Sequence, residues 1–312
     1  MSSLPDGRRA QVAAALVVAG LLGGTAAAFA YTEHLKLERS PVLRTHVGKL
    51  VGPRCHCQWR RIKIQFVLRK PDRLSVVVVD SHGNVVRTLL ASSPRPAGAQ
   101  RFVWDGRDDS GQVVPAGTYK PRLHLANEHR TILMPNPITV DPIPPKISLV
   151  SLSPRVFSPG PGFRHRAVSV RYRTSERAQA LLYVNGSPGP VNRYAESGVL
   201  HWLGTGLPAG RYRLTLRALD LAGNLSAPLR LGVVRIRYIE VRPHVLHPLA
   251  GARIGFRVVA DARRIQWRIA GRTGVSRPGL LVLRAPRAGR FHLVVSVGGH
   301  TAQALVIVRP RR

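Results

Sequence analysis

Apolar and polar residues alternate with a period of two in many short segments of this 312-residue chain. In residues 61–68 (RIKIQFVL) every second residue is apolar, and residues 211–218 (RYRLTLRA) alternate in the same way. This pattern is typical of antiparallel strands that have one face against a core and the other in water. The 29 glycines and 25 prolines that separate such segments argue against a helical bundle or a coiled coil. The sequence therefore predicts an all-β fold.

An internal repeat divides the chain after its N-terminal part. A glycine followed by an aromatic residue begins a strand pattern at 115–119 (PAGTY), at 208–212 (PAGRY) and at 286–291 (PRAGRF). Trp104 and Trp202 precede the first two of these glycines, whereas the third unit lacks that tryptophan and has Trp267 elsewhere. One third of residues 51–312 is about 87 residues, which is close to the size of an immunoglobulin-like sandwich. We expect tandem Ig-like β-sandwiches, two of them well marked and a third, smaller one.

The N-terminal segment 10–32 contains no charged residue and follows Arg8 and Arg9. As a helix it would span about 34 Å, which is enough to cross a bilayer. The arginine pair favours a cytoplasmic position for residues 1–9, so the rest of the chain would be extracytoplasmic, anchored in a bacterial cytoplasmic membrane by a single pass. The alternative is a signal peptide that is cleaved near Ala30, after the small residues of Ala28-Phe29-Ala30, which would release a secreted protein. The apolar run continues to Tyr31, which favours the retained anchor.

Composition also predicts the domain boundaries. Residues 33–50 are polar with one proline and are expected to be a juxtamembrane linker. Proline-rich joints at 135–145 and 241–248 then separate three domains, which we place at 51–141, 142–239 and 240–312.

The repeated hairpins carry a family resemblance. Residues 104–119 (WDGRDDSGQVVPAGTY) place Trp104, Asp105, Gly106, Pro115, Gly117 and Tyr119 in the pattern of the closing hairpin of the flagellar hook-capping (FlgD-like) Ig-like domain. That domain recurs in membrane-anchored and secreted bacterial surface proteins. The resemblance covers 51–140, and 142–235 look like a degenerate second copy in which Trp202, Pro208, Gly210 and Tyr212 correspond. The resemblance implies a scaffold and no flagellar role, because no segment is similar to the assembly-directing N-terminal region of the hook-capping protein.

Cys55 and Cys57, the only cysteines, flank His56. They could form a local disulfide, pair between two chains, bind copper(I) or zinc together with the histidine, or act in redox chemistry. A structural disulfide is the favoured interpretation. Asp105 is explained by its turn, and the loop 160–164 contains no carboxylate for calcium. We therefore predict no catalytic residue, no cofactor and no metal site.

The net charge of +33 arises from 48 Lys and Arg against 15 Asp and Glu. Because arginines are spread along the chain, codon bias on a solvated surface explains this charge, while attraction to a polyanion is the functional alternative. We expect a non-enzymatic interaction or structural module of the bacterial cell envelope. Its partners would be the membrane through 10–32 and an envelope protein or an anionic wall polymer. The alternative is a polyanion receptor, with nucleic acid as a weaker option, and the oligomeric state is left open.

Overall fold

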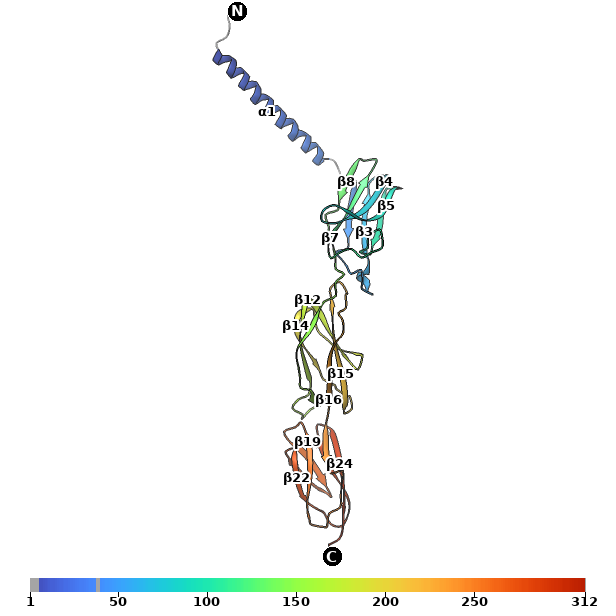
Figure 1. The fold of residues 1–312 in the computed structure, drawn as a ribbon, viewed down its shortest axis with the longest axis vertical. Coiled ribbons are helices and arrows are strands. Elements are labelled where there is room, and N and C mark those ends of the chain that lie inside the picture. The colour runs from blue at the N-terminus through green and yellow to red at the C-terminus, as the bar shows by residue number, and fades with distance from the viewer. Residues whose placement is uncertain (1–5, 38–39, 312) are drawn as a thin grey trace, which may run out of the picture. The chain divides into compact units, whose positions relative to one another are not determined.

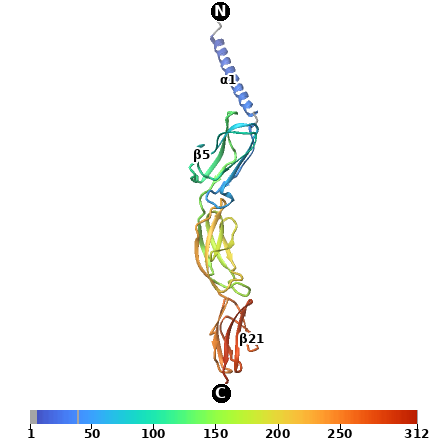
Figure 2. The same ribbon diagram turned by 90° about the vertical axis from the view of Figure 1, so that its right-hand side faces the viewer.

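The computed structural model describes residues 6–37 and 40–311, in which one α-helix is followed by strands and by a single-turn 3-10 helix, η1 (Gln58–Arg60). The chain divides into two compact units. One unit contains the residues up to Val51 together with Arg61–Val140, and the other contains Gly52–Arg60 and Asp141–Arg312. Figures 1 and 2 show α1 and three separate groups of strands in chain order.

Helix α1 extends over Asp6–Leu37 and is longer than the predicted segment 10–32. Its stretch Gln11–Ala30 has a mean hydropathy of 2.1, and none of it is buried within the protein. A helix of this length and composition can cross a membrane or serve as a signal sequence. The helix continues past the apolar stretch because Glu33–Leu37 contains good helix formers and no proline or glycine.

The first sandwich is built from two sheets. The smaller sheet has the order β1 (Val42–Val47), β3 (Ile62–Leu68), β6 (Gly98–Trp104). The larger sheet has the order β2 (Leu50–Val51), β9 (Ile138–Val140), β7 (Gly117–Leu125), β4 (Asp72–Val79), β5 (Val85–Arg95), with β8 (Arg130–Leu133) paired to β7. The alternation in β3 buries Ile62, Ile64, Phe66 and Leu68. These side chains meet those of β4 and β7 in one core.

The predicted linker 33–50 is wrong for its second half, since Val42–Val47 forms β1 of this sandwich. Val42 and Val47 are both buried, although their spacing does not fit a period of two. The reason is a register shift in the pairing with β3 between Leu43 and His46, where Arg44 has a φ of 48°. Such a bulge inserts an extra residue and interrupts the alternation that marks a strand in the sequence.

The second sandwich depends on one long strand, β12 (Val168–Val184), which serves both layers. Its first half pairs with β10 (Ile147–Ser153) and β14 (Ala195–Trp202). Its second half pairs with β15 (Gly210–Asp220) and β13 (Ser187–Val191). The remaining strands β16 (Leu229–Ile236) and β11 (Val156–Phe157) follow β15 in the same layer. Phe157, Tyr172 and Leu216 lie in the core between the layers.

The third sandwich repeats this plan with separate strands. One sheet has the order β17 (Ile239–Arg242), β19 (Arg253–Ala260), β22 (Gly279–Arg284). The other has the order β18 (Val245–Leu246), β24 (His300–Val308), β23 (Gly289–Val297), β20 (Ile265–Ile269), β21 (Arg272–Ser276). Trp267 lies on β20, so it is not the counterpart of Trp104, which ends β6.

All three sandwiches share one connectivity. In each of them a two-residue strand pairs in parallel with the last strand of the sandwich: β2 with β9, β11 with β16, and β18 with β24. The other pairings within the sandwiches are antiparallel. The predicted fold class, tandem Ig-like sandwiches after an apolar N-terminal helix, is confirmed.

Candidate functional site

Trp104 and Tyr119 form a corner where the chain crosses between the sheets of the first sandwich. Trp104 ends β6, and Gly117 begins β7 two residues before Tyr119. The two rings meet edge to face, with centroids 5.4 Å apart. The Tyr119 hydroxyl donates a hydrogen bond of 2.9 Å to the carbonyl of Pro115, and the Trp104 indole N–H donates one of 2.8 Å to the carbonyl of Arg107. This arrangement is a tyrosine corner, which stabilises Ig-like folds.

The second sandwich repeats this corner. The Trp202 and Tyr212 rings are also 5.4 Å apart, edge to face, and the Tyr212 hydroxyl donates a hydrogen bond of 2.8 Å to the carbonyl of Pro208. In the third sandwich Phe291 takes the aromatic position after Gly289 and has no hydroxyl to donate. The motif residues of both corners therefore have structural roles.

The acidic residues near the first corner are used in turns. The Asp105 carboxylate accepts from the N–H of Arg107, and Gly106 has a φ of 72°. The Asp108 carboxylate accepts from the Ser110 hydroxyl and the Gln112 N–H, and these bonds lower its pKa, the Ser110 bond having the largest effect. The same Asp-x-x-Gly turn occurs at Asp80 and at Asp220, with an asparagine at the next position. No acid–base role is needed to explain these residues.

Cys55 and Cys57 are bonded to each other, with their Cα atoms 5.3 Å apart. The segment Gly52–Arg60 that contains them belongs to the same compact unit as the second sandwich. It packs on the turn of that sandwich between β15 and β16. A Cβ on Gly223 would lie 2.4 Å from the Cys57 sulfur, and a Cβ on Gly52 would lie 2.1 Å from the carbonyl oxygen of Ala222. The structure thus contains the local disulfide, one of the alternatives that the sequence left open.

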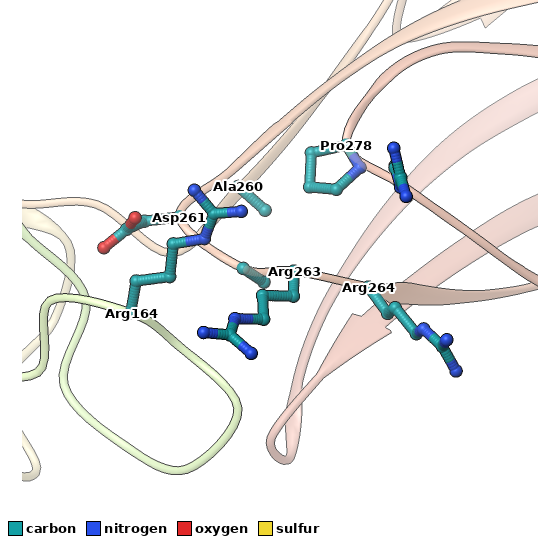
Figure 3. A pocket seen from close by; sticks show the side chains of 8 residues that line it. Arg164, Ala260, Asp261, Arg263, Arg264 and Pro278 are labelled. Carbon is teal, nitrogen blue, oxygen red and sulfur yellow. The ribbon is translucent and has the colours of Figure 1, made fainter.

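An arginine hollow lies where loops of the second and third sandwiches meet. We use this name for the cavity of about 640 Å³ that is lined by Arg164, Ala260, Asp261, Ala262, Arg263, Arg264, Arg277 and Pro278. Figure 3 shows Arg164, Arg263 and Arg264 projecting around it from two loop segments. Arg277 comes from a third segment, the short connection between β21 in one sheet and β22 in the other.

Backbone contacts hold the loops of the arginine hollow together. The N–H of Arg164 donates a hydrogen bond of 2.8 Å to the carbonyl of Asp261, and Phe163 forms a β-bridge with Ala262. The Asp261 carboxylate accepts from the backbone N–H of His165 at 2.8 Å and lies 3.1 Å from its ring Nδ1. These contacts position the hollow on a defined junction within one unit.

The four guanidinium groups of the hollow are available for a ligand. All four arginines are exposed, and among the residues that the structure describes none of these groups makes an ion pair or a hydrogen bond. Asp261, the only carboxylate in the lining, is already bonded to His165. Guanidinium groups bind phosphate and carboxylate in a bidentate manner, so the hollow suits an anion. The sequence offered only the Arg263-Arg264 pair as a signal, because the loops that bring in Arg164 and Arg277 are distant in the chain.

Comparisons with known proteins agree with the resemblance drawn from the first hairpin. Residues 59–128 match the family model of the FlgD Ig-like domain. Over 61 residues the chain is 38% identical to the basal-body rod modification protein FlgD of Salmonella typhimurium, and equally to that of Salmonella typhi. Each match spans 19% of this chain and 26% of the relative, so this chain covers about a quarter of the length of those proteins.

Comparison with solved structures gives matches of low sequence identity. They include fibronectin(III)-like modules of Clostridium thermocellum CbhA, with 16% identity, a TM-score of 0.34, and coverage of 62% of this chain and 93% of that one. The titin I-band fragment I67–I69 has 12% identity, a TM-score of 0.34, and coverage of 88% and 100%. A bacterial ice-binding adhesin has 13% identity, a TM-score of 0.29, and coverage of 88% and 100%.

The corner of the second sandwich can be tested with Tyr212→Phe. Removing the hydroxyl leaves the Pro208 carbonyl without its donor, and we expect the free energy of unfolding of this sandwich to fall by about 1 kcal/mol. Tyr183→Phe is the control, because no hydrogen bond from its hydroxyl is present among the described residues. Hydrogen–deuterium exchange of β15, recorded across a denaturant titration, measures the free energy of unfolding of both variants. Equal effects of the two changes would contradict the role of the corner.

The contact between the disulfide and its turn can be tested with Gly223→Ala. Gly223 has a φ of 84° and faces Cys57, whereas Gly83 has a φ of 85° in the same type of turn, and a Cβ added there would meet no atom within 4 Å beyond its chain neighbours. Gly83→Ala therefore measures the backbone strain alone, about 1–2 kcal/mol. We expect Gly223→Ala to lower the free energy of unfolding by more than this. The rate at which dithiothreitol reduces the disulfide should rise at least threefold, which corresponds to a loss of under about 1 kcal/mol of packing. An unchanged reduction rate would show that the turn does not protect the disulfide.

Proposed function

We propose that this chain is a non-enzymatic, membrane-anchored interaction module of the bacterial cell envelope. Helix α1 holds it in the cytoplasmic membrane, and the sandwiches act in the extracytoplasmic space. The match of residues 59–128 to an Ig-like domain family supports a role in interactions, since such sandwiches present edges and end loops to partners.

The arginine hollow is the observation that supports the choice of partner in this proposal. Four arginines whose guanidinium groups make no ion pair or hydrogen bond among the described residues line it, together with a single carboxylate that already has a partner. Residues 240–312 contain 14 arginines, and Asp261 and Glu240 are their only acidic side chains. A field of this sign attracts polyanions and raises their local concentration. The partner in the proposal is an anionic polymer of the envelope, bound through its phosphate or carboxylate groups.

A defined polyanion tests this proposal. We expect the full chain in detergent to bind fluorescent poly(glycerol phosphate) with an affinity that falls steeply as the salt concentration rises. The double variant Arg263→Ala/Arg264→Ala should weaken binding at least tenfold, about 1.4 kcal/mol. The control Arg211→Ala/Arg213→Ala removes the same charge from the exposed face of β15 and should weaken it less than threefold, under about 0.7 kcal/mol.

Two outcomes would contradict the proposal, the first for the binding site and the second for the ligand. Equal losses in both double variants would mean that net charge alone attracts the polymer. Tighter binding of single-stranded DNA than of poly(glycerol phosphate), with the same sensitivity to the Arg263/Arg264 change, would make nucleic acid the ligand.

The anchor is tested separately. Alkaline phosphatase fused after Arg312 is expected to be active in intact cells, because the enzyme needs the oxidising side of the membrane to form its disulfides. The mass of the membrane-bound chain should include residues 1–30, since a retained α1 is not processed. Release of a chain that begins at Tyr31 would instead support the signal peptide, and an inactive fusion would reverse the orientation.

A further inference from the structure

Three carboxylates converge at one end of the second sandwich, away from the arginine hollow. Asp141 directly follows β9, Glu176 lies in the middle of β12, and Asp220 is the last residue of β15. Each offers an oxygen within 4.8 Å of the oxygens from the other two. Asp220 is 2% exposed, and the other two are half-buried.

The three charges are not compensated by an ion pair within the described part of the chain. Among the residues that the structure describes, none of the three carboxylates forms an ion pair, in a chain with 48 lysines and arginines. Burial raises the pKa of Glu176, and the neighbouring Asp141 and Asp220 raise it further. Burial also raises the pKa of Asp220, against the opposing effect of its hydrogen bonds with Asn224. Like charges that are gathered out of water destabilise the fold unless a cation joins them.

Asn224 supplies a second, independent observation. Its side chain is 3% exposed and is directed into the cluster, where its Nδ2 donates hydrogen bonds of 2.9 Å to Asp220 Oδ2 and 2.8 Å to the carbonyl oxygen of Asp141. Its Oδ1 is buried and has no hydrogen-bond partner among the described residues. A buried amide oxygen without a donor costs free energy. Since the two ends of an amide have nearly the same shape, a half-turn of the group would bring Oδ1 beside the oxygens of Asp141 and Asp220 and would move Nδ2 to the buried position that Oδ1 leaves.

We propose that Asp141, Glu176, Asp220 and Asn224 bind a calcium ion. Carboxylate, amide and backbone carbonyl oxygens are the ligands that Ca²⁺ takes, and its flexible coordination suits donors from four separate segments. Mg²⁺ requires stricter octahedral geometry and retains its waters. The ion joins three like charges, and after the half-turn of the amide it also binds the Asn224 oxygen. This site goes beyond the proposed function and does not depend on it.

Calorimetric titration of the full chain in detergent with CaCl₂ tests this site. We expect saturable binding of one ion with a dissociation constant in the range of extracellular modules, about 10⁻⁴–10⁻³ M. The melting temperature of the second sandwich should rise in CaCl₂ relative to EDTA, because the ion binds only the folded state. MgCl₂ should bind at least tenfold more weakly.

Two matched variants separate the site from general surface charge. Glu176→Gln keeps the side-chain shape and should raise the Ca²⁺ dissociation constant at least tenfold. Glu240→Gln removes the same charge from a glutamate that pairs with Arg242 on β17 and should leave it unchanged. Calcium binding should also persist in Arg263→Ala/Arg264→Ala, which separates this test from that of the polyanion.

Three results would overturn the calcium site. The first is the absence of saturable binding up to about 10 mM Ca²⁺. The second is equal binding by the wild type and Glu176→Gln. The third is a Glu176→Gln variant that is more stable than the wild type at every calcium concentration and whose stability depends on calcium as that of the wild type does. Removal of one charge would then be enough to reduce the repulsion within the cluster.

Discussion

The edge-to-face contact of an indole with a tyrosine ring is the interaction on which the first two sandwiches depend. The chain must leave one layer after Trp104 or Trp202 and enter the other at Gly117 or Gly210. The tyrosine hydroxyl holds the carbonyl of the crossing segment, and its ring packs on the tryptophan. With that crossing held, the alternating strands on both sides place their apolar faces in one core, and the connecting loops are free to vary.

The sequence predicts the fold well because its signals are local. Alternation along β3 and β15 and the repeated glycine–aromatic strand starts follow directly from the geometry of a half-buried strand. Alternation does not predict the first strand, because the irregular pairing around Arg44 places the two buried residues Val42 and Val47 an odd number of positions apart. The sequence does not predict the arginine hollow or the carboxylate cluster, because their residues are distant in the chain. Asp141, Glu176 and Asp220 are 35 and 44 residues apart, and the fold brings them together.

The family resemblance and the candidate binding features fall on different parts of the chain. The matched residues 59–128 belong to the first sandwich. The arginine hollow and the carboxylate cluster belong to the other unit, whose third sandwich has Phe291 in place of the corner tyrosine. The part of the chain that matches a known family therefore contains neither the arginine hollow nor the carboxylate cluster. This separation agrees with the general rule that function resides in sites built on folds.

The parallel pairing of a short early strand with the last strand has a mechanical consequence for each sandwich. A force applied between the two ends of a sandwich pulls β11 and β16, for example, in opposite directions along the axis that they share. Their hydrogen bonds are then loaded together in shear, and they resist extension as a group, whereas bonds loaded one after another open like a zipper. In this geometry the pairing of the short strand with the last strand acts as a clamp between the two ends of each sandwich.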